Sequence, residues 1–222
     1  MRRALVLFTG TGSVDRSLEA VGFQVDNLDM DPKCNATWTC DVLDWEAWRD
    51  GTYDFIHSSP PCVQYSIART RAKTPRNFEL ADRIVQRTLD IIAHLKPRGW
   101  LMENPASGYL RTRDVVAGLP FRDVCYCRYS DGINHKYRKH TRLWGVLPGF
   151  VPRPLCSPSS PCDFSKTQAG IRWSHSGSSR EPVSNSPSTI CIPCLKRSAT
   201  TWPRPPGPCS PCIWTGASSG SF

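Results

Sequence analysis

The fold is decided by residues 2–31, which read RRALVLFTGTGSVDRSLEAVGFQVDNLDMD. The apolar run at residues 3–8 predicts a short buried strand, and a glycine-rich turn then leads into a helix expected over residues 14–21. Ser13 is the expected N-cap of this helix, because its hydroxyl can accept a hydrogen bond from a backbone N–H of the first turn. A second strand is predicted at residues 23–28. A strand, a crossover helix and another strand indicate the start of a parallel sheet.

The same alternation continues along the chain. Further strands are expected near residues 39–40 and at 53–57, 100–102 and 122–126, with helices over 79–95 and 112–117. Strands that alternate with helices indicate an α/β fold with a mainly parallel central sheet and helices on both faces. In such a sheet, ligands bind outside the carboxyl ends of the strands. Asp29, Cys62 and Glu103 each lie where a predicted strand ends, so we expect them to face one crevice.

The chain has 222 residues and a formal net charge of +9. A basic excess of this size favours a polyanionic partner, most commonly nucleic acid, although a basic surface without a specific partner is equally compatible with the charge. The sequence shows neither the apolar core of a signal peptide nor a run of about 18 apolar residues, and we therefore expect a soluble, intracellular protein without a membrane segment. Eleven cysteines in such a protein indicate reduced thiols, metal ligands or a catalytic cysteine.

Composition divides the chain into two regions. Residues 1–150 carry the alternating strand and helix pattern and are expected to form the main domain. Residues 151–222 are rich in proline, serine and cysteine and show no sustained period, which predicts a disordered tail rather than a second core. Two Cys-x-x-Cys pairs in this tail, at residues 191–194 and 209–212, have the spacing of zinc knuckles. The surrounding prolines leave little backbone for a zinc ribbon, so we predict no metal site.

The turn after the first strand is a candidate nucleoside site. Gly10 and Gly12 let the backbone turn tightly and let a ligand approach the start of the helix, although many such turns carry glycine for structural reasons alone. Asp29, close to 20 residues further on, is placed to accept both hydroxyls of a ribose. Asp41 follows the expected third strand and could receive an adenine amino group. Each acidic residue alone is more typical of a solvated turn, whereas the three features in this order predict a nucleoside pocket.

Pro60, Pro61 and Cys62 form the most specific motif. Two prolines fix the backbone directly before a cysteine at a strand end, which makes a rigid platform for a thiol. A buried structural cysteine is the more common fate of a free cysteine. Glu103, at the end of the next predicted strand, favours the reactive interpretation. A thiolate and a carboxylic acid can act as a pair, in which the thiolate adds to an electron-poor ring carbon while the acid protonates a ring nitrogen.

Taken together, these segments resemble the cytosine-C5 DNA methyltransferase family, and in particular its small members from phages and algal viruses. The matching positions, in the family's order, are Phe8, Gly10 and Gly12 in the cofactor loop, Asp29 and Met30 in the ribose-binding turn, Asp41 and Val42 at the adenine contact, Pro60 and Cys62 in the nucleophile loop, Glu103 in the Glu-Asn motif, and Arg142 in the arginine-bearing strand. Val63 departs from the family, which most often has glutamine after the nucleophile. Beyond residue 150 nothing resembles the family's target-recognition domain or its final helix, as expected of a truncated, fused or frame-shifted C-terminus.

The resemblance implies a Rossmann-like fold and methyl transfer from S-adenosyl-L-methionine to C5 of a cytosine that is flipped out of double-stranded DNA. Cys62 would attack C6 of the base, Glu103 would bond N3, and Arg142 would steady the ring. A basic loop after the cysteine could hold DNA phosphates or be a solvated charged loop; its cations are Arg69, Arg71, Lys73 and Arg76. Two alternatives remain open, an RNA cytosine-C5 methyltransferase and an inactive, truncated copy that only binds nucleic acid. The sequence indicates no protein partner.

Overall fold

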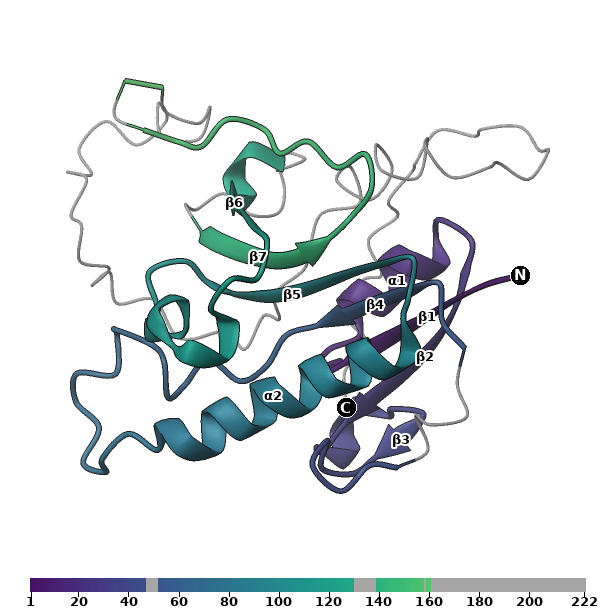
Figure 1. Cartoon of the computed structure of the whole chain (residues 1–222), viewed down its shortest axis with the longest axis horizontal. Coiled ribbons are helices and arrows are strands. Elements are labelled where there is room, and N and C mark those ends of the chain that lie inside the picture. Colours follow the sequence, from purple (N-terminus) through teal and green to yellow (C-terminus); the bar gives the residue numbers. More distant parts are fainter. Residues whose placement is uncertain (47–51, 130–138, 158, 161–222) are drawn as a thin grey trace, which may run out of the picture.

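The computed structural model describes residues 1–46, 52–129, 139–157 and 159–160. Within these ranges, one sheet holds seven strands in the order β3-β2-β1-β4-β5-β7-β6. The strands are β1 (Arg2–Leu7), β2 (Phe23–Asp29), β3 (Trp38–Thr39), β4 (Phe55–Ser58), β5 (Gly99–Pro105), β6 (Phe121–Cys125) and β7 (His140–Val146), and the α-helices are α1 (Ser13–Glu19) and α2 (Phe78–Leu95). The first five strands in this order, from β3 through β2, β1 and β4 to β5, pair in parallel. Strand β7 runs antiparallel between β5 and β6. The predicted mainly parallel α/β sheet is confirmed (Figure 1).

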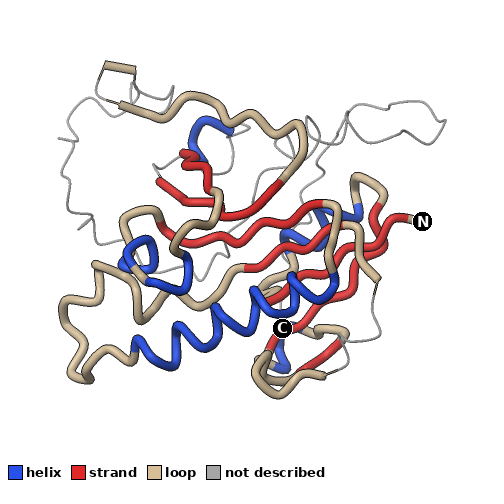
Figure 2. The backbone as a smooth tube through the Cα atoms, in the orientation of Figure 1, coloured by secondary structure: helices blue, strands red, loops and turns tan. Residues whose placement is uncertain are grey.

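The two α-helices cover opposite faces of the sheet. Successive residues of β1 point to opposite sides, so Val6 packs in one core cluster with Leu18 of α1, whereas Leu7 packs in another with Ile91 of α2. Figure 1 shows α2 crossing in front of the strands with α1 behind them, and Figure 2 shows the same layers as a tube. This three-layer arrangement explains why the central strands read as continuous apolar runs in the sequence.

Two local predictions were wrong. The helix expected over residues 112–117 is replaced by two 3-10 turns, η3 (Tyr109–Thr112) and η4 (Asp114–Val116). Gly118 follows at a φ of 74°, so the segment is too short to continue as an α-helix. Ser13 is not the N-cap of α1, because the helix begins one residue earlier than expected and Gly12 takes the cap position at a φ of 70°.

The chain after β7 packs back against the main domain. Cys156 is buried against Cys125 and Cys127, and the Sγ atoms of Cys127 and Cys156 lie 3.2 Å apart. The N–H of Arg153 donates to the Tyr129 hydroxyl at 2.7 Å. The first residues of the predicted tail therefore contact the main domain. Most of that tail, with both Cys-x-x-Cys pairs, lies outside the described residues.

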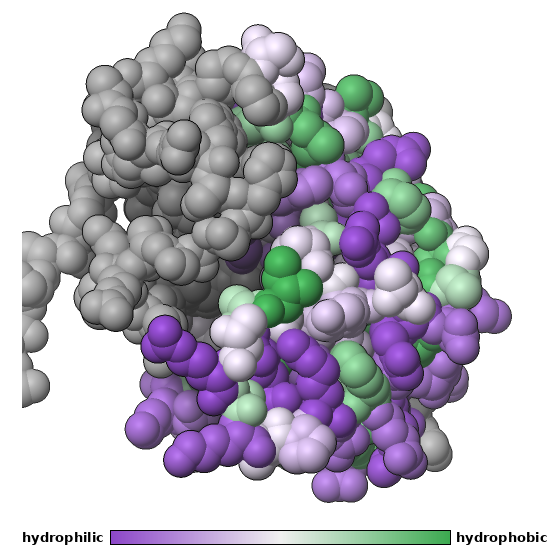
Figure 3. Space-filling model, turned by 90° about the vertical axis from the view of Figure 1, so that its left-hand side faces the viewer, coloured by the Kyte–Doolittle hydropathy of each residue, from purple (hydrophilic) through white to green (hydrophobic). Residues whose placement is uncertain are grey.

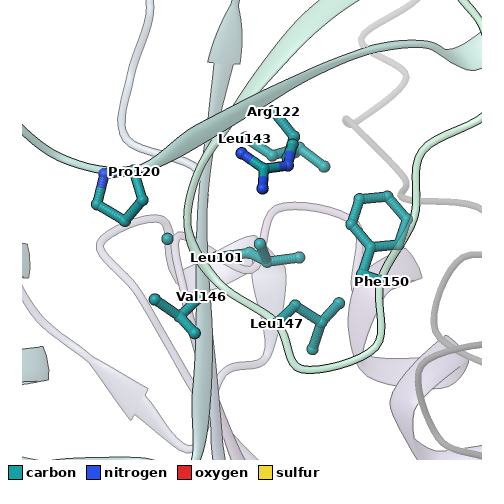
Figure 4. Close-up of a pocket in the computed structure, with 8 residues that line it drawn as sticks. Leu101, Pro120, Arg122, Leu143, Val146, Leu147 and Phe150 are labelled. Atoms are coloured by element: carbon teal, nitrogen blue, oxygen red, sulfur yellow. The ribbon is translucent and has the colours of Figure 1, made fainter.

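Figure 4 shows a cavity lined by residues of β5, β6 and β7 and of the segments next to them. Its volume is about 170 Å³. Leu101 lies at its centre, with Pro120 and Val146 on one side and Leu147 and Phe150 on the other. Its lining includes Leu143, the cross-strand partner of Glu103, but neither Glu103 nor Cys62 lines it. Ligand pockets usually enclose about 300–1,000 Å³, so this cavity is too small for a nucleoside cofactor.

The described helices include none that is long and apolar enough to cross a membrane. Among the described residues, no cluster of three or more His, Cys, Asp or Glu side chains could hold a metal ion. On the face shown in Figure 3, hydrophilic and apolar side chains are interspersed.

Candidate active site

The turn between β1 and α1 has an unusual backbone. Phe8, Gly10 and Gly12 have positive φ angles of 63°, 56° and 70°. Glycine adopts this left-handed region without a steric penalty, whereas Phe8 is strained there. The N–H of Gly10 donates to Asp29 Oδ2 at 2.9 Å, and the N–H of Phe8 donates to the carbonyl of Leu28 at 2.8 Å. The glycine turn and the acid predicted to act with it are therefore joined at the carboxyl edge of the sheet.

Asp29 keeps capacity for a ligand. Its Oδ1 accepts from the N–H of Asp31 at 2.9 Å, and each carboxylate oxygen has a further lone pair. Met30, the next residue, is 69% exposed, so a large apolar side chain follows the acid in the same turn. A carboxylate next to an apolar side chain suits a ribose that carries a planar base.

Strand β3 brings the predicted adenine-contact residues, Asp41 and Val42, to the same edge. The N–H of Cys40 donates to the carbonyl of Asp29 at 3.2 Å, and Asp41 follows directly. The Oδ1 atom of Asp41 accepts from the N–H of Leu43 at 2.9 Å, which fixes the carboxylate in the turn. Val42 is buried in the core cluster beneath α2, so its side chain supports this edge from below.

A buried hydrogen-bond network under the glycine turn was not foreseen. Thr9 Oγ1 donates to Asp15 Oδ2 at 2.6 Å, and Asn27 Nδ2 donates to Asp15 Oδ1 at 2.5 Å. Asp15 is 5% exposed, and these bonds replace the water that its carboxylate loses. They fasten α1 to β2 directly below the turn. Asn27, a polar residue next to the buried Leu28 in β2, was the available sequence signal.

Cys62 lies partly buried in the turn after β4. Its carbonyl accepts from two backbone N–H groups of the following turn, at 3.0 and 2.8 Å. The carbonyl of Pro60 accepts from Asn104 Nδ2 at 2.9 Å in a buried bond. The platform that carries the thiol is thereby fastened to β5, next to Glu103.

Arg76 supports the loop that follows the cysteine. Its guanidinium donates to the carbonyl of Gln64 at 2.6 Å and to that of Ser66 at 2.9 Å. It also stacks on Tyr109, 5.0 Å from the ring centroid. Arg76 therefore holds backbone carbonyls of this chain, which is a structural role that the sequence did not indicate.

The other three cations of the loop are less engaged. Arg71 and Lys73 are exposed, and Arg69 donates to Thr74 Oγ1 at 2.7 Å. Val63, directly after the cysteine, is 60% exposed. The phosphate-binding role of these cations stays a prediction.

Tyr65 anchors the same loop to α2. It is fully buried, and its hydroxyl donates to Asp82 Oδ1 at 2.7 Å. Arg113 holds the other oxygen of Asp82 through Nε at 3.0 Å and Nη2 at 2.6 Å. Burial, followed by the hydrogen bond to Asp82, raises the pKa of Tyr65 well above its usual value, so the hydroxyl remains a donor.

Glu103 is 3% exposed and lies inside β5, because the pairing of β5 with β7 continues as far as Pro105. Lys139 Nζ is 3.4 Å from Glu103 Oε1. Burial raises the pKa of the Cys62 thiol, the charge of Glu103 raises it further, and the charge of Lys139 lowers it. The structure therefore brings the predicted pair together and adds a cation that the sequence analysis missed.

Arg142 lies on the other side of the sheet from Glu103. In the register of β5 and β7, Glu103 is opposite Leu143, and neighbouring residues of a strand point to opposite faces. The Arg142 guanidinium pairs with both oxygens of Asp123, at 2.7 and 2.9 Å. The predicted contact between Arg142 and the base stays a prediction, and the cation that the structure places beside Glu103 is Lys139.

Comparison with known proteins identifies the family of this chain. No family model matches the chain. A curated relative from Frog virus 3 (isolate Goorha), named "Probable DNA (cytosine-5)-methyltransferase", is 30% identical over 187 residues, which cover 78% of this chain and 84% of the relative. This chain belongs to the DNA cytosine-C5 methyltransferase family. The resemblance read from the sequence motifs is thereby confirmed.

Solved structures show the methyltransferase fold. A protein assigned as a prophage-encoded DNA modification methyltransferase of E. coli superposes with a TM-score of 0.50 at 17% identity, over 70% of this methyltransferase and 52% of that chain. The S. pombe Dnmt2 methyltransferase gives a TM-score of 0.42 at 16% identity, over 66% and 49% of the two chains. The chain thus spans about half the length of both structures.

Proposed function

We propose that this chain transfers a methyl group from S-adenosyl-L-methionine to C5 of a flipped cytosine in DNA, through a covalent adduct with Cys62. The proposal rests on the hydrogen bond from Asn104 to the carbonyl of Pro60, which holds the turn with Cys62 beside the buried Glu103. Membership of the family supports the reaction class and its DNA substrate. A substrate of this kind implies an intracellular location.

The residues at the carboxyl edge of β1 to β3 fit the cofactor. The left-handed glycines leave the backbone open to a close approach, Asp29 retains lone pairs for ribose hydroxyls, and the exposed Met30 offers an apolar contact for the adenine. When bound, the sulfonium supplies an electrophilic methyl group. Asp41 and Pro60 would complete the pocket on either side.

The chemistry then follows from the pair of reactive side chains. The Cys62 thiolate forms a bond to C6 of cytosine, and the displaced electron pair moves into the ring. Glu103, as an acid, protonates or hydrogen-bonds N3, so that C5 becomes the nucleophile that accepts the methyl group. A base removes the C5 proton, the electron pair returns to the C5–C6 bond, and the Cys62 thiolate leaves.

The proposal is tested with duplexes that contain 5-fluorocytosine, in which no C5 proton can be removed and the adduct persists. Wild-type protein with S-adenosyl-L-methionine should give a covalent band, and Cys62→Ala should not. Loss of the nucleophile should slow methyl transfer to cytosine by several orders of magnitude. Cys34→Ala, which removes another partly exposed cysteine, is the matched control and should trap normally.

Parallel DNA and RNA duplexes separate the proposal from its closest alternative. Trapping on RNA alone would replace DNA by RNA as the substrate. Methyl transfer by Cys62→Ala within tenfold of wild type would eliminate the covalent mechanism.

A further inference from the structure

Asn27 connects helix α1 to the segment before β3. It follows Phe23 and Val25 on the face of β2 that packs against α1, so its amide enters the layer between strand and helix. Its Nδ2 donates to Asp15 Oδ1 at 2.5 Å, and its Oδ1 accepts from the N–H of Thr37 at 2.7 Å. The N–H of Asn27 donates in turn to Thr37 Oγ1 at 3.3 Å. One amide side chain therefore joins α1 to the edge of the sheet beside β3.

Asp15 carries this connection on to the glycine turn. Its Oδ2 accepts from Thr9 Oγ1 at 2.6 Å, so each carboxylate oxygen binds a different element. Thr9 is 4% exposed and is fixed on both sides, because its N–H donates to the carbonyl of Leu28 at 3.1 Å and its own carbonyl accepts from the N–H of Gly12 at 3.0 Å. A shift of the Asp15 carboxylate would therefore move the backbone of the glycine turn.

Neither Asp15 nor Asn27 is placed to bind a ligand directly. Asp15 is 5% exposed, and both of its oxygens accept from donors of this chain. The Asn27 amide uses its nitrogen on Asp15 and its oxygen on Thr37. A buried carboxylate is costly to leave partly unpaired, so the members of this network hold one another in one arrangement. Any effect of the two residues on a ligand therefore passes through the turns that they hold.

These two turns form opposite sides of the proposed cofactor site. Thr9 lies directly before Gly10 in the glycine turn. On the other side, Thr37 lies directly before β3, which leads to Asp41. Asp29, the proposed ribose acceptor, lies between the two. A nucleoside that contacts both turns needs the correct spacing between them, because a misplacement of about 1 Å can cost about 100-fold in rate.

We propose that Asp15 and Asn27 are positioning residues for S-adenosyl-L-methionine, which set the spacing between the glycine turn and the turn after β3. The inference rests on the proposed function, because it needs the cofactor in this site. It gives the buried network a role beyond fastening α1 to β2. Breaking the network at either end should loosen cofactor binding, while Cys62 and Glu103 stay in place.

The first readout is cofactor binding, which needs no methylation. Thr9→Val removes the hydroxyl that donates to Asp15, Thr9→Ser keeps it, and Asn27→Leu removes both ends of the amide. Titration calorimetry on the full-length protein gives the Kd of S-adenosyl-L-methionine for each. Thr9→Val and Asn27→Leu should raise this Kd about five- to tenfold, the effect of losing one hydrogen bond to a charged group. Thr9→Ser should stay close to wild type.

Ser17→Ala is the matched control within the same helix. Ser17 is 2% exposed, and its Oγ donates to the carbonyl of Ser13 at 2.8 Å, so its hydrogen bond stays inside α1 and joins no second element. Thermal unfolding should show a loss of stability like that of Thr9→Val, whereas the Kd of the cofactor should not change. Equal weakening of cofactor binding by Ser17→Ala would show that any loosening of α1 has this effect, and the inference would be wrong.

The second readout is the coupling between the two ends of the network. Thr9 and Asn27 both act through Asp15, so the double variant should weaken binding by less than the product of the two single effects. In methyl transfer, the KM for S-adenosyl-L-methionine should rise by the same factor as the Kd, while kcat at saturating cofactor stays within about twofold of wild type. Independent effects of the two substitutions, or a loss confined to kcat, would contradict a positioning role.

The possible failures of the two proposals can be told apart. A wild-type protein that binds the cofactor, together with Thr9→Val and Asn27→Leu variants that bind it equally well, would overturn the inference and leave the proposed function standing. A wild-type protein that binds no S-adenosyl-L-methionine would contradict the proposed function, and the positioning role would fall with it. If Asn27→Leu does not fold, the comparison of Thr9→Val with Thr9→Ser still decides, because Thr9 lies in a turn outside the helices and strands.

Discussion

At the scale of single residues, Cys62 lies among groups that oppose its ionisation. Burial and the charge of Glu103 both raise its pKa, and Lys139 offsets only part of this. A thiol with a raised pKa is mostly protonated at neutral pH, so the proposed mechanism requires the thiolate to form when the substrate is in place. This protects the cysteine from oxidation and alkylation in the free enzyme, because the thiolate is the reactive form.

Asp29 provides the residue-scale test of the cofactor site. Asp29→Ala removes a charged acceptor and two backbone hydrogen bonds, one from Gly10 in the glycine turn and one from Asp31 in the turn after β2. We expect binding of S-adenosyl-L-methionine to weaken by about 1.5–3 kcal/mol, which is roughly 10- to 150-fold in Kd. Titration calorimetry on the full chain measures this loss. Asp90→Ala, an exposed acid on α2, is the control, and unchanged affinity in Asp29→Ala would show that the ribose site has been misplaced.

At the scale of elements, the order of strands and helices could be read from the sequence, whereas the partners of individual side chains could not. The helix predicted over residues 79–95 is observed as α2, because its apolar spacing is set within one segment. The side of the sheet on which Arg142 lies depends instead on the register of β7 against β5, which joins residues far apart in the chain. Lys139 was missed for the same reason.

Some residues of the site could likewise be placed from the sequence, whereas the side chains that support them could not. Asp29 is the last residue of β2 and Cys62 lies in the turn that follows β4, where the apolar runs stop, and the sequence was sufficient to place both at one edge. The side chains that hold the neighbouring backbone in place could not be identified from the sequence. Arg76 reads as one more cation in a basic loop, and only the folded backbone shows that it holds the carbonyls of Gln64 and Ser66.

The antiparallel pairing of β5 and β7 depends on a glycine at their closest approach. Gly145 has a φ of 128°, and a Cβ atom there would lie 2.2 Å from the carbonyl oxygen of Trp100. Gly145→Ala should therefore separate β7 from β5 and reduce the free energy of unfolding by about 3 kcal/mol or more, from overpacking together with backbone strain. Urea denaturation measures the change.

Gly118→Ala is the matched control for Gly145→Ala. Gly118 also has a positive φ, of 74°, but a Cβ atom there would meet nothing within 4 Å. Only the backbone strain remains, which costs about 1–2 kcal/mol. Equal losses in the two variants would show that the close approach of β7 to Trp100 contributes nothing to stability.

At the scale of the whole molecule, the net charge of +9 is the feature that a DNA substrate has to engage. The charge count alone does not locate the contact, because a uniformly basic surface would give the same sum. The sequence analysis predicts the contact in the loop after Cys62. There Arg76 is engaged with backbone carbonyls, while Arg71 and Lys73 are exposed beside the reactive turn. Cations in this position would hold the phosphates that flank a flipped base.

The salt dependence of binding tests that location. Each phosphate neutralised by a cation contributes about −0.9 to the slope of log K against log salt concentration on duplex DNA. Replacing both Arg71 and Lys73 by glutamine should therefore make the slope shallower by about 1.8. A second variant, with Lys33 and Arg83 replaced by glutamine, changes the net charge by the same amount at exposed positions away from the loop. Fluorescence anisotropy on one duplex at several salt concentrations gives all three slopes. If both double variants change the slope equally, the attraction is a property of the overall charge and the loop does not bind phosphate. A change confined to the Arg71 and Lys73 variant would fix the path of the DNA backbone next to Cys62.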